Sequence, residues 1–133
     1  MNTKERRWLV ELSEAVRLSS VRRVMLVPES VENWRPAPRL MSFADLAQHL
    51  IDADEWLFRK LKEHALQPMQ GRPGLVRVGG RDEYLRLIER LNQTGEARSA
   101  LIGSLSSNMW NHEIPVAFWW QCERVVDSLA RQP

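Results

Sequence analysis

The sequence predicts an all-α protein built as a four-helix bundle. Four stretches carry apolar residues at helical spacing, and three connections that contain proline or glycine separate them. No stretch shows the alternating pattern of an amphipathic strand, and Leu75–Val78 is too short and too isolated to predict one. A chain of 133 residues corresponds to about one domain. We therefore expect a single helical bundle domain over residues 1–133.

Composition narrows the class of protein. Hydrophobic residues make up 44% of the chain and charged residues 27%, which is typical of a globular protein. The net charge of +2 comes from basic and acidic residues that are interspersed, so we expect no nucleic-acid partner. No signal-peptide core and no apolar run of about 18 residues is present, which predicts a cytoplasmic protein without a membrane partner. The single cysteine, Cys122, excludes an internal disulfide, and a buried, inert thiol is expected there.

The first helix is predicted from about Lys4 to Leu26. Its expected core face consists of residues near helical spacing, namely Trp8, Leu12, Ala15, Val16, Ser19 and Val24. Pro28 ends this helix. The three prolines between Pro28 and Arg39 predict an ordered loop, with room for one helical turn over Glu29–Glu32.

The second helix is predicted to begin at Ser42 and to end near His64 or Ala65. The Ser42 side chain can accept from a backbone N–H three residues on, and Asp45 suits the positive end of the helix. The expected core face is Leu46, Leu50, Ala53, Leu57 and Leu61. His49 lies at the edge of this face, where an inward-leaning imidazole is a familiar starting point for a metal site in a helical bundle.

The third helix is predicted from about Arg81 to Leu105, after a glycine-rich connection over residues 67–80. Its apolar positions, Tyr84, Ile88, Leu91, Gly95, Ile102 and Leu105, keep the four-three rhythm of packed helices. Arg98 breaks that rhythm once. Gly95 weakens a helix interior by about 1 kcal/mol relative to alanine, so we expect it to mark a kink or a close helix crossing.

The fourth helix is predicted to begin at Pro115, which suits a first helical position. Trp119, Cys122, Val126 and Leu129 form its apolar face. Among six tryptophans, Trp8, Trp56 and Trp119 fit core positions. This surplus of large apolar groups on short helices also fits the interface of a homodimer.

Three segments of this sequence resemble the DinB-like superfamily, which includes YfiT-type and mycothiol-dependent proteins. The run NWRPAPRLMSFADLAQHLIDADEW resembles that family's approach to its second helix. RDEYLRLIERL resembles the opening of its third helix, and HEIPVAFWW resembles the start of its fourth. The resemblance implies a DinB-like bundle with up-down-down-up helix order, long connections and frequent pairing into homodimers.

The same resemblance implies a divalent metal held by three histidines, one in helix two and two that stand four apart in helix four. His49 matches the first histidine, but helix four of this chain has none. The two missing ligands fall on Arg124 and Ser128 or on Glu123 and Asp127, depending on the register. At 100° per residue Glu123 and Asp127 lie nearer the core, so they are the favoured occupants.

Two functions follow, and the sequence leaves both open. One is a bundle with a degenerate or absent metal site that needs no cofactor and acts by self-association or by binding a small molecule. In this case His49 is a hydrogen-bonded structural residue, and Glu123 and Asp127 pair with Arg124 or Arg131. The other is a metal-dependent enzyme of the small-thiol transferase type, with Zn, Ni, Mn or Fe held by His49, Glu123 and Asp127. The missing histidine pair favours the first function.

Overall fold

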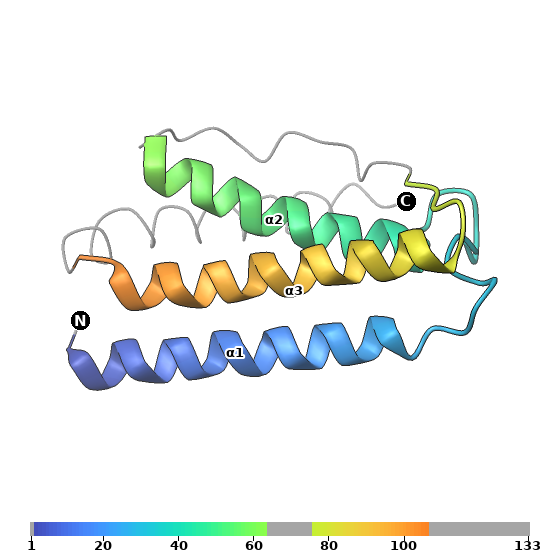
Figure 1. Cartoon of the computed structure of the whole chain (residues 1–133). Helices are drawn as coiled ribbons and strands as arrows, with labels where there is room; N and C mark the ends of the chain where they lie inside the picture. The colour runs from blue at the N-terminus through green and yellow to red at the C-terminus, as the bar shows by residue number, and fades with distance from the viewer. Residues whose placement is uncertain (1, 64–75, 107–133) are drawn as a thin grey trace, which may run out of the picture.

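A computed structural model describes residues 2–63 and 76–106, with the side chains of the second helix described as far as Arg59. This part of the chain is all-helical, without strands, and contains α1 (Thr3–Met25), α2 (Phe43–Glu63) and α3 (Arg81–Ser104) (Figure 1). The first three of the four predicted helices are therefore present within two residues of their expected bounds. The predicted fourth helix, with Glu123 and Asp127, lies outside the described residues.

The three helices run up, down and down (Figure 1). α1 is antiparallel to α3, because the start of α3 bonds the end of α1 and its last turns bond the middle of α1: the Tyr84 hydroxyl donates to the Val24 carbonyl at 2.7 Å, and Ser99 Oγ lies 2.9 Å from Ser13 Oγ. α2 and α3 begin at the same end of the molecule. The last residue of α2 and the first residue of α3 are therefore separated by about the length of α2, or about 30 Å at 1.5 Å per residue.

Two reciprocal caps fix where α1 and α2 begin. Asn2 Oδ1 accepts from the Glu5 N–H at 2.8 Å, while Glu5 Oε2 accepts from the Asn2 N–H at 3.2 Å. Ser42 and Asp45 repeat the arrangement at distances of 3.0 and 2.9 Å, which confirms the predicted start of α2. The Asn-x-x-Glu signature that sets the start of α1 was readable in the sequence and was missed.

The core lies between α2, α3 and the C-terminal end of α1. The rhythm of α3 is confirmed, since Tyr84, Ile88, Leu91, Gly95 and Leu105 are buried, although Ile102 is half-buried. The predicted face of α2 is wrong by about one residue. Its buried apolar residues are Ala44, Ala47, Ile51 and Trp56, whereas Leu50, Ala53 and Leu57 are half-buried and Leu46 is exposed. Small alanines let two helices approach closely, and a pattern of large residues does not reveal them.

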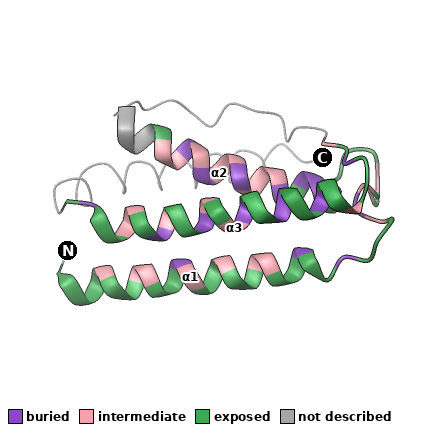
Figure 2. Cartoon of the chain, in the orientation of Figure 1, coloured by how far each residue is buried: buried purple, intermediate pink, exposed green. Residues whose placement is uncertain are grey.

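The predicted core face of α1 is wrong except at Val24. Of the six expected core residues only Val24 is buried, and the other five are exposed. Figure 2 shows α1 exposed along the side that faces away from α3 and buried or half-buried toward α3. The side toward α3 instead carries Ser13 and Arg17, which bond across to α3. Polar contacts, not the apolar stripe, thus set the rotation of α1.

Candidate functional site

Of the three metal ligands predicted from the sequence, only His49 lies among the described residues. His49 lies half-buried on α2, and no hydrogen bond or ion pair engages its imidazole among the described residues. Asp45, one turn earlier, is occupied by the helix cap, and Asp52, one turn later, accepts from Gln48 at 2.9 Å. Over residues 2–63 and 76–106 no three His, Cys, Asp or Glu residues gather closely enough to hold a metal ion.

A partly buried ion pair between Arg98 and Asp54, together with Ser13, joins all three helices. Arg98 on α3 donates from Nη1 to Asp54 Oδ1 on α2 at 2.8 Å, and from Nε to Ser13 Oγ on α1 at 2.9 Å. Its Nη2 also donates to the Ser13 carbonyl at 3.2 Å. The Asp54 side chain is 6% exposed, and its Oδ2 is buried without a hydrogen-bond partner. Arg98, which interrupts the apolar rhythm of α3, is therefore the partner that makes a charged core position on α2 tolerable.

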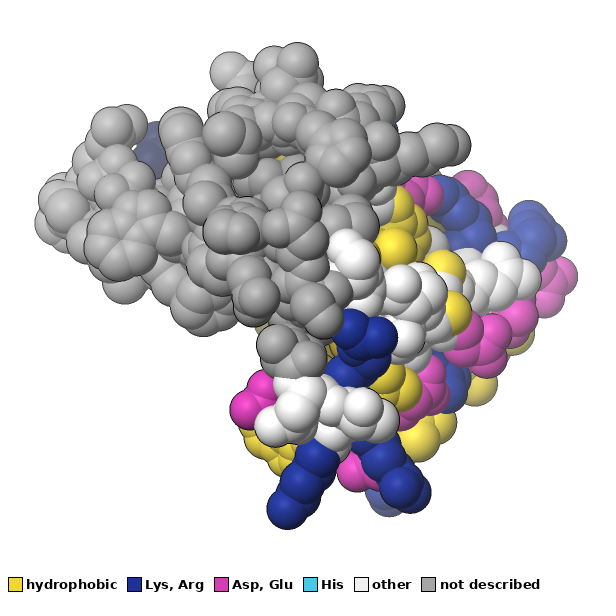
Figure 3. Space-filling model, turned by 90° about the vertical axis from the view of Figure 1, so that its left-hand side faces the viewer, with side chains coloured by type: hydrophobic (Ala, Val, Ile, Leu, Met, Phe, Trp, Pro, Cys, Tyr) yellow, Lys and Arg dark blue, Asp and Glu magenta, His cyan; other side chains and the backbone are white. Residues whose placement is uncertain are grey.

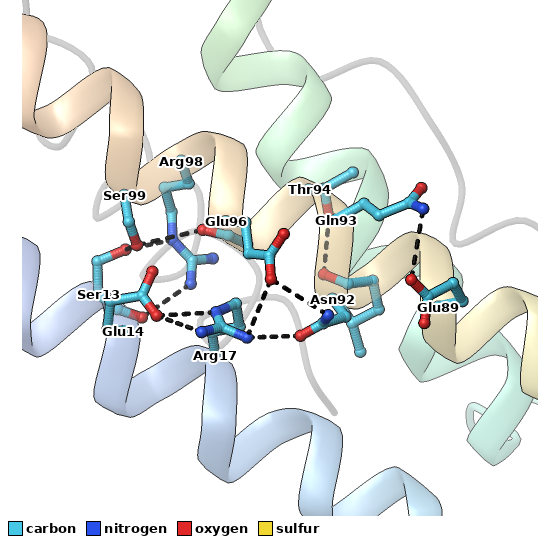
Figure 4. A network of polar contacts seen from close by, with 12 residues as sticks. Ser13, Glu14, Arg17, Glu89, Asn92, Gln93, Thr94, Glu96, Arg98 and Ser99 are labelled. Atoms are coloured by element: carbon cyan, nitrogen blue, oxygen red, sulfur yellow. Dashed lines mark hydrogen bonds and ion pairs between the residues drawn. The ribbon is translucent and has the colours of Figure 1, made fainter.

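A second polar cluster lies between α1 and α3 (Figure 4). Arg17 extends from α1 and is paired with Glu14 on its own helix, while its Nη1 donates to Asn92 Oδ1 on α3 at 2.6 Å. Hydrogen bonds from Arg17 first and from Ser99 next hold the pKa of Glu14 below its usual range. A Cβ added at Gly95 would lie 2.7 Å from Arg17 Cγ, so Gly95 marks a close approach of the Arg17 side chain to α3.

These two clusters hold the helices in register and offer no set of catalytic groups. Each guanidinium is already engaged by a carboxylate from a neighbouring turn or helix. An arginine does not give up its proton at neutral pH, so neither Arg17 nor Arg98 can act as a general base. The interior charges are neutralised in pairs, which is the arrangement of structural contacts between helices.

At the end of the molecule where α2 and α3 begin, polar contacts hold the loops against each other and against the start of α2. The Asp45 carboxylate accepts from the Val76 N–H at 2.7 Å and is paired with Arg35. Although burial raises it, hydrogen bonds from the Ser42 and Val76 backbones and from Arg35 hold the pKa of Asp45 below its usual range. Asn33 bonds both backbone groups of Val78, at 2.7 and 2.9 Å. The loop before α2 is thus ordered, as predicted. It consists of turns and bends, and the helical turn considered for Glu29–Glu32 does not form.

An open hollow of about 500 Å³ lies at the start of α3. Charged side chains of both signs line it together with two glycines, and the lining residues are Glu29, Gly79, Gly80, Arg81, Asp82, Glu83 and Arg86. Two of these charges are already engaged, because Arg81 binds Glu32 at 3.0 Å and Glu83 accepts from the Gly79 N–H. The hollow therefore presents no convergent set of unpaired groups to a ligand.

The outstanding feature of the surface is an apolar stripe on α1. We define the α1 stripe as six exposed residues on the side of the helix away from α3, namely Trp8, Leu12, Ala15, Val16, Ser19 and Leu26. At about 100° per residue, Leu12 lies about 120° around the helix from the buried Val24 and about 140° from Arg17. Sequence reasoning found five of these residues as an apolar pattern but assigned them to the core.

Over residues 2–63 and 76–106 the chain is all-helical, and α1 carries an exposed apolar face there. Within the described ranges, no helix combines the length and the apolar character that crossing a membrane requires. A search for similar proteins found no match among family models, curated proteins or solved structures. The function must therefore be argued from the residues of this chain.

Proposed function

We propose that this chain is a DinB-like helical bundle without a working metal centre, and that it acts by binding a second copy of itself through the α1 stripe. The observation that carries the proposal is the exposure of the stripe. Trp8 is 61% exposed, Leu12 46%, Val16 48% and Leu26 73%. Single exposed apolar residues are ordinary, but a contiguous row along one helix is typical of an interaction surface.

The size of the stripe supports association of moderate strength. An aromatic side chain buries about 150–250 Å² at about 25 cal/mol per Å², so covering the exposed part of Trp8 contributes about 2–4 kcal/mol. Leu12, Val16 and Leu26 add about 1–2 kcal/mol each on the same scale. A symmetric dimer uses the stripe twice, which gives a gross gain of about 10–20 kcal/mol.

The gross gain must offset the loss of translational and rotational freedom. That cost is about 4–15 kcal/mol for two proteins, so a net of several kcal/mol remains. The corresponding dissociation constant is roughly micromolar, since a net of about 8 kcal/mol gives about 1 μM. We therefore expect a dimer that forms at high protein concentration and dissociates on dilution.

The test is the oligomeric state of the full chain over about 1–500 μM, a range that brackets the expected dissociation constant. Sedimentation equilibrium should show the wild type passing from monomer to dimer. Trp8→Glu should stay monomeric because the interface would bury an unpaired carboxylate. The matched control is Leu85→Glu, which places the same charge at a 39% exposed leucine of α3 outside the stripe and should dimerise normally. Circular dichroism checks that both variants stay helical.

Two results would contradict this proposal. A wild type that is monomeric at every concentration would exclude self-association. A Trp8→Glu variant that dimerises as well as the wild type and Leu85→Glu would show that a different surface forms the dimer.

We propose the metal-dependent enzyme as the second candidate, because the half-buried His49 imidazole has no partner among the described residues. In this case His49, Glu123 and Asp127 would hold a divalent cation that supplies Lewis-acid chemistry to a thiol or a water. The test is the metal content of protein purified without a metal-affinity tag, followed by titration with Zn, Ni, Mn and Fe(II). Stoichiometric binding that His49→Ala abolishes and His64→Ala preserves would support the site. Binding no stronger than background in the wild type, His49→Ala and His64→Ala would contradict the metal site.

A further inference from the structure

We infer that a single copy of this chain binds an anionic lipid bilayer through the α1 stripe, with α1 lying parallel to the bilayer surface. The inference goes beyond the proposed self-association and does not require it, because the stripe is free in the monomer below the dimer dissociation constant. The sequence predicted no membrane partner because no apolar run is long enough to span a bilayer, but contact with the bilayer surface needs no spanning segment. The charge around the stripe and its place on the molecule carry the inference.

Cations flank the stripe at both of its ends. Lys4, Arg22 and Arg23 are exposed and have no ion-pair partner among the described residues. At about 100° per residue, Arg22 lies about 40° to one side of Leu26 and Arg23 about 60° to the other side, while Lys4 lies about 40° from Trp8. Their long stems allow the charged groups to reach headgroup phosphates while the apolar side chains between them leave water.

The carboxylates beside the stripe are already engaged on α1 itself. Glu5 accepts from the Asn2 N–H in the helix cap, and Glu11 is paired with Arg7 at 3.3 Å. Over Thr3–Met25 the helix has six basic and three acidic side chains, which gives it a net charge of +3. A second copy of the chain leaves this excess of positive charge in place, whereas an anionic surface neutralises it. The charge of α1 is therefore complementary to an anionic surface.

The place of α1 on the molecule suits contact with a flat surface. α1 forms one edge of the described part of the molecule, and its exposed side follows that edge (Figures 1 and 2). The helix has 23 residues, so it is about 35 Å long, and the stripe from Trp8 to Leu26 covers about 27 Å of that length. A flat surface can therefore contact the whole stripe at once.

The chemistry of the stripe matches a helix that lies in a bilayer interface. Figure 3 looks along the helices from the end where α1 begins, so α1 lies at the lower edge, where basic side chains extend furthest and hydrophobic ones lie beside them. Tryptophan and leucine on one side of a helix, with lysine and arginine next to them, are typical of such helices. The indole of Trp8 suits the headgroup level, where tryptophan is enriched. Lipids also rearrange around large and small side chains, so the uneven row from Trp8 to Leu26 needs no partner of matching shape.

The experiment is co-sedimentation of the full chain with vesicles of phosphatidylcholine alone and of phosphatidylcholine mixed with phosphatidylserine. The protein is kept at about 0.1 μM, below the expected dimer dissociation constant. We expect the wild type to bind the vesicles that contain phosphatidylserine and to bind the others much more weakly. Each lysine or arginine near an anionic membrane strengthens binding about fivefold, so Arg22→Gln/Arg23→Gln should weaken it about 25-fold. Raising the salt from about 0.1 M to about 1 M should also release the protein, because the Debye length falls from about 10 Å to about 3 Å.

The matched control is Arg39→Gln/Arg86→Gln, which removes two exposed arginines outside the stripe. It changes the net charge of the chain by the same amount as Arg22→Gln/Arg23→Gln, so it separates the charge of the stripe from the charge of the whole molecule. This variant should bind the anionic vesicles as the wild type does. Trp8→Glu should lose binding, because the bilayer interface would bury an unpaired carboxylate. Circular dichroism checks that all variants stay helical.

Three results would overturn the inference. Equal binding to both kinds of vesicle would show that charge does not decide the contact, and equal loss in the two double variants would show that the stripe is not the site. A folded wild type that binds neither vesicle would exclude the bilayer and leave an acidic protein as the partner that the charge of α1 fits.

The outcome is separate from that of the proposed self-association. Arg22→Gln/Arg23→Gln keeps every apolar residue of the stripe, so it should still dimerise in sedimentation equilibrium while it loses vesicle binding. A chain that dimerises but binds no vesicles would contradict this inference alone. A chain that binds anionic vesicles and stays monomeric at every concentration would contradict the proposed self-association alone.

Discussion

Replacement of Arg98 by methionine tests whether the partly buried ion pair holds the three helices together. Methionine replaces the unbranched stem of arginine but not its guanidinium group. The substitution therefore removes three hydrogen bonds, one to Asp54 and two to Ser13. The Asp54 carboxylate, 6% exposed, would be left with neither oxygen partnered. Breaking a buried pair in this way costs about 3–5 kcal/mol. The Arg98 side chain is 21% exposed, which places the expected loss near the lower end, at about 3 kcal/mol.

Removing both charges in Asp54→Leu/Arg98→Met should recover most of the stability, because no buried charge remains unpaired.

The assay is urea unfolding followed by circular dichroism, which gives the free energy of unfolding and its m-value. The control is Arg90→Met, which breaks the other pair between α2 and α3: Arg90 and Glu55 are 3.3 Å apart, with side chains 52% and 45% exposed. An exposed pair of this kind contributes less than about 1 kcal/mol. If Arg98→Met proved no more destabilising than Arg90→Met, the contact between Arg98 and Asp54 would not be the one that holds these helices.

Three further predictions concern the packing of α3 and the clamp on α2. Gly95→Ala should lower the free energy of unfolding by about 1 kcal/mol, because its Cβ would lie 2.7 and 2.8 Å from Arg17 Cγ and Cδ. In an Arg17→Ala background only the 3.2 Å contact with the Cβ of residue 17 remains, so the loss should be smaller, and a double-mutant cycle measures the difference. The lowered pKa of Asp45 means that its stabilisation is present above about pH 4 and is lost as the pH falls further, so acid unfolding of Asp45→Asn should depend less on pH in that range. Tyr84→Phe should cost about 1 kcal/mol in urea unfolding because it removes the 2.7 Å hydrogen bond from the Tyr84 hydroxyl to the Val24 carbonyl and leaves that carbonyl with the longer bond from the Val27 N–H at 3.4 Å.

Helical periodicity was sufficient to predict the elements and the packing of α3. The burial of Tyr84, Ile88 and Leu91 follows directly from a regular apolar row on a helix whose other side is polar. The cap at Ser42 was also predictable, because a short polar side chain three residues before an acidic one is a local signal. The directions of the three described helices agree with the first three of the predicted up-down-down-up order.

Periodicity failed where contacts between helices decide which side faces inward. Asp54 and Arg98 were each readable as charges on an otherwise apolar face, but their pairing depends on a juxtaposition of α2 and α3 that local sequence does not contain. The same holds for the metal hypothesis. His49 is placed half-buried, while the positions of Glu123 and Asp127 depend on a helix outside the described residues.

The rotation of α1 shows most clearly why an apolar pattern does not identify its partner. Trp8, Leu12 and Val16 satisfy the spacing of a core face, and the same spacing is required of any face that meets another helix. What separates the two possibilities is the other side of α1, where Ser13 and Arg17 already bond to α3 and fix the rotation. A helix with one side held by polar contacts and the other apolar has two interfaces to satisfy. The described fold satisfies one, and the free apolar side is where we expect the second copy to bind.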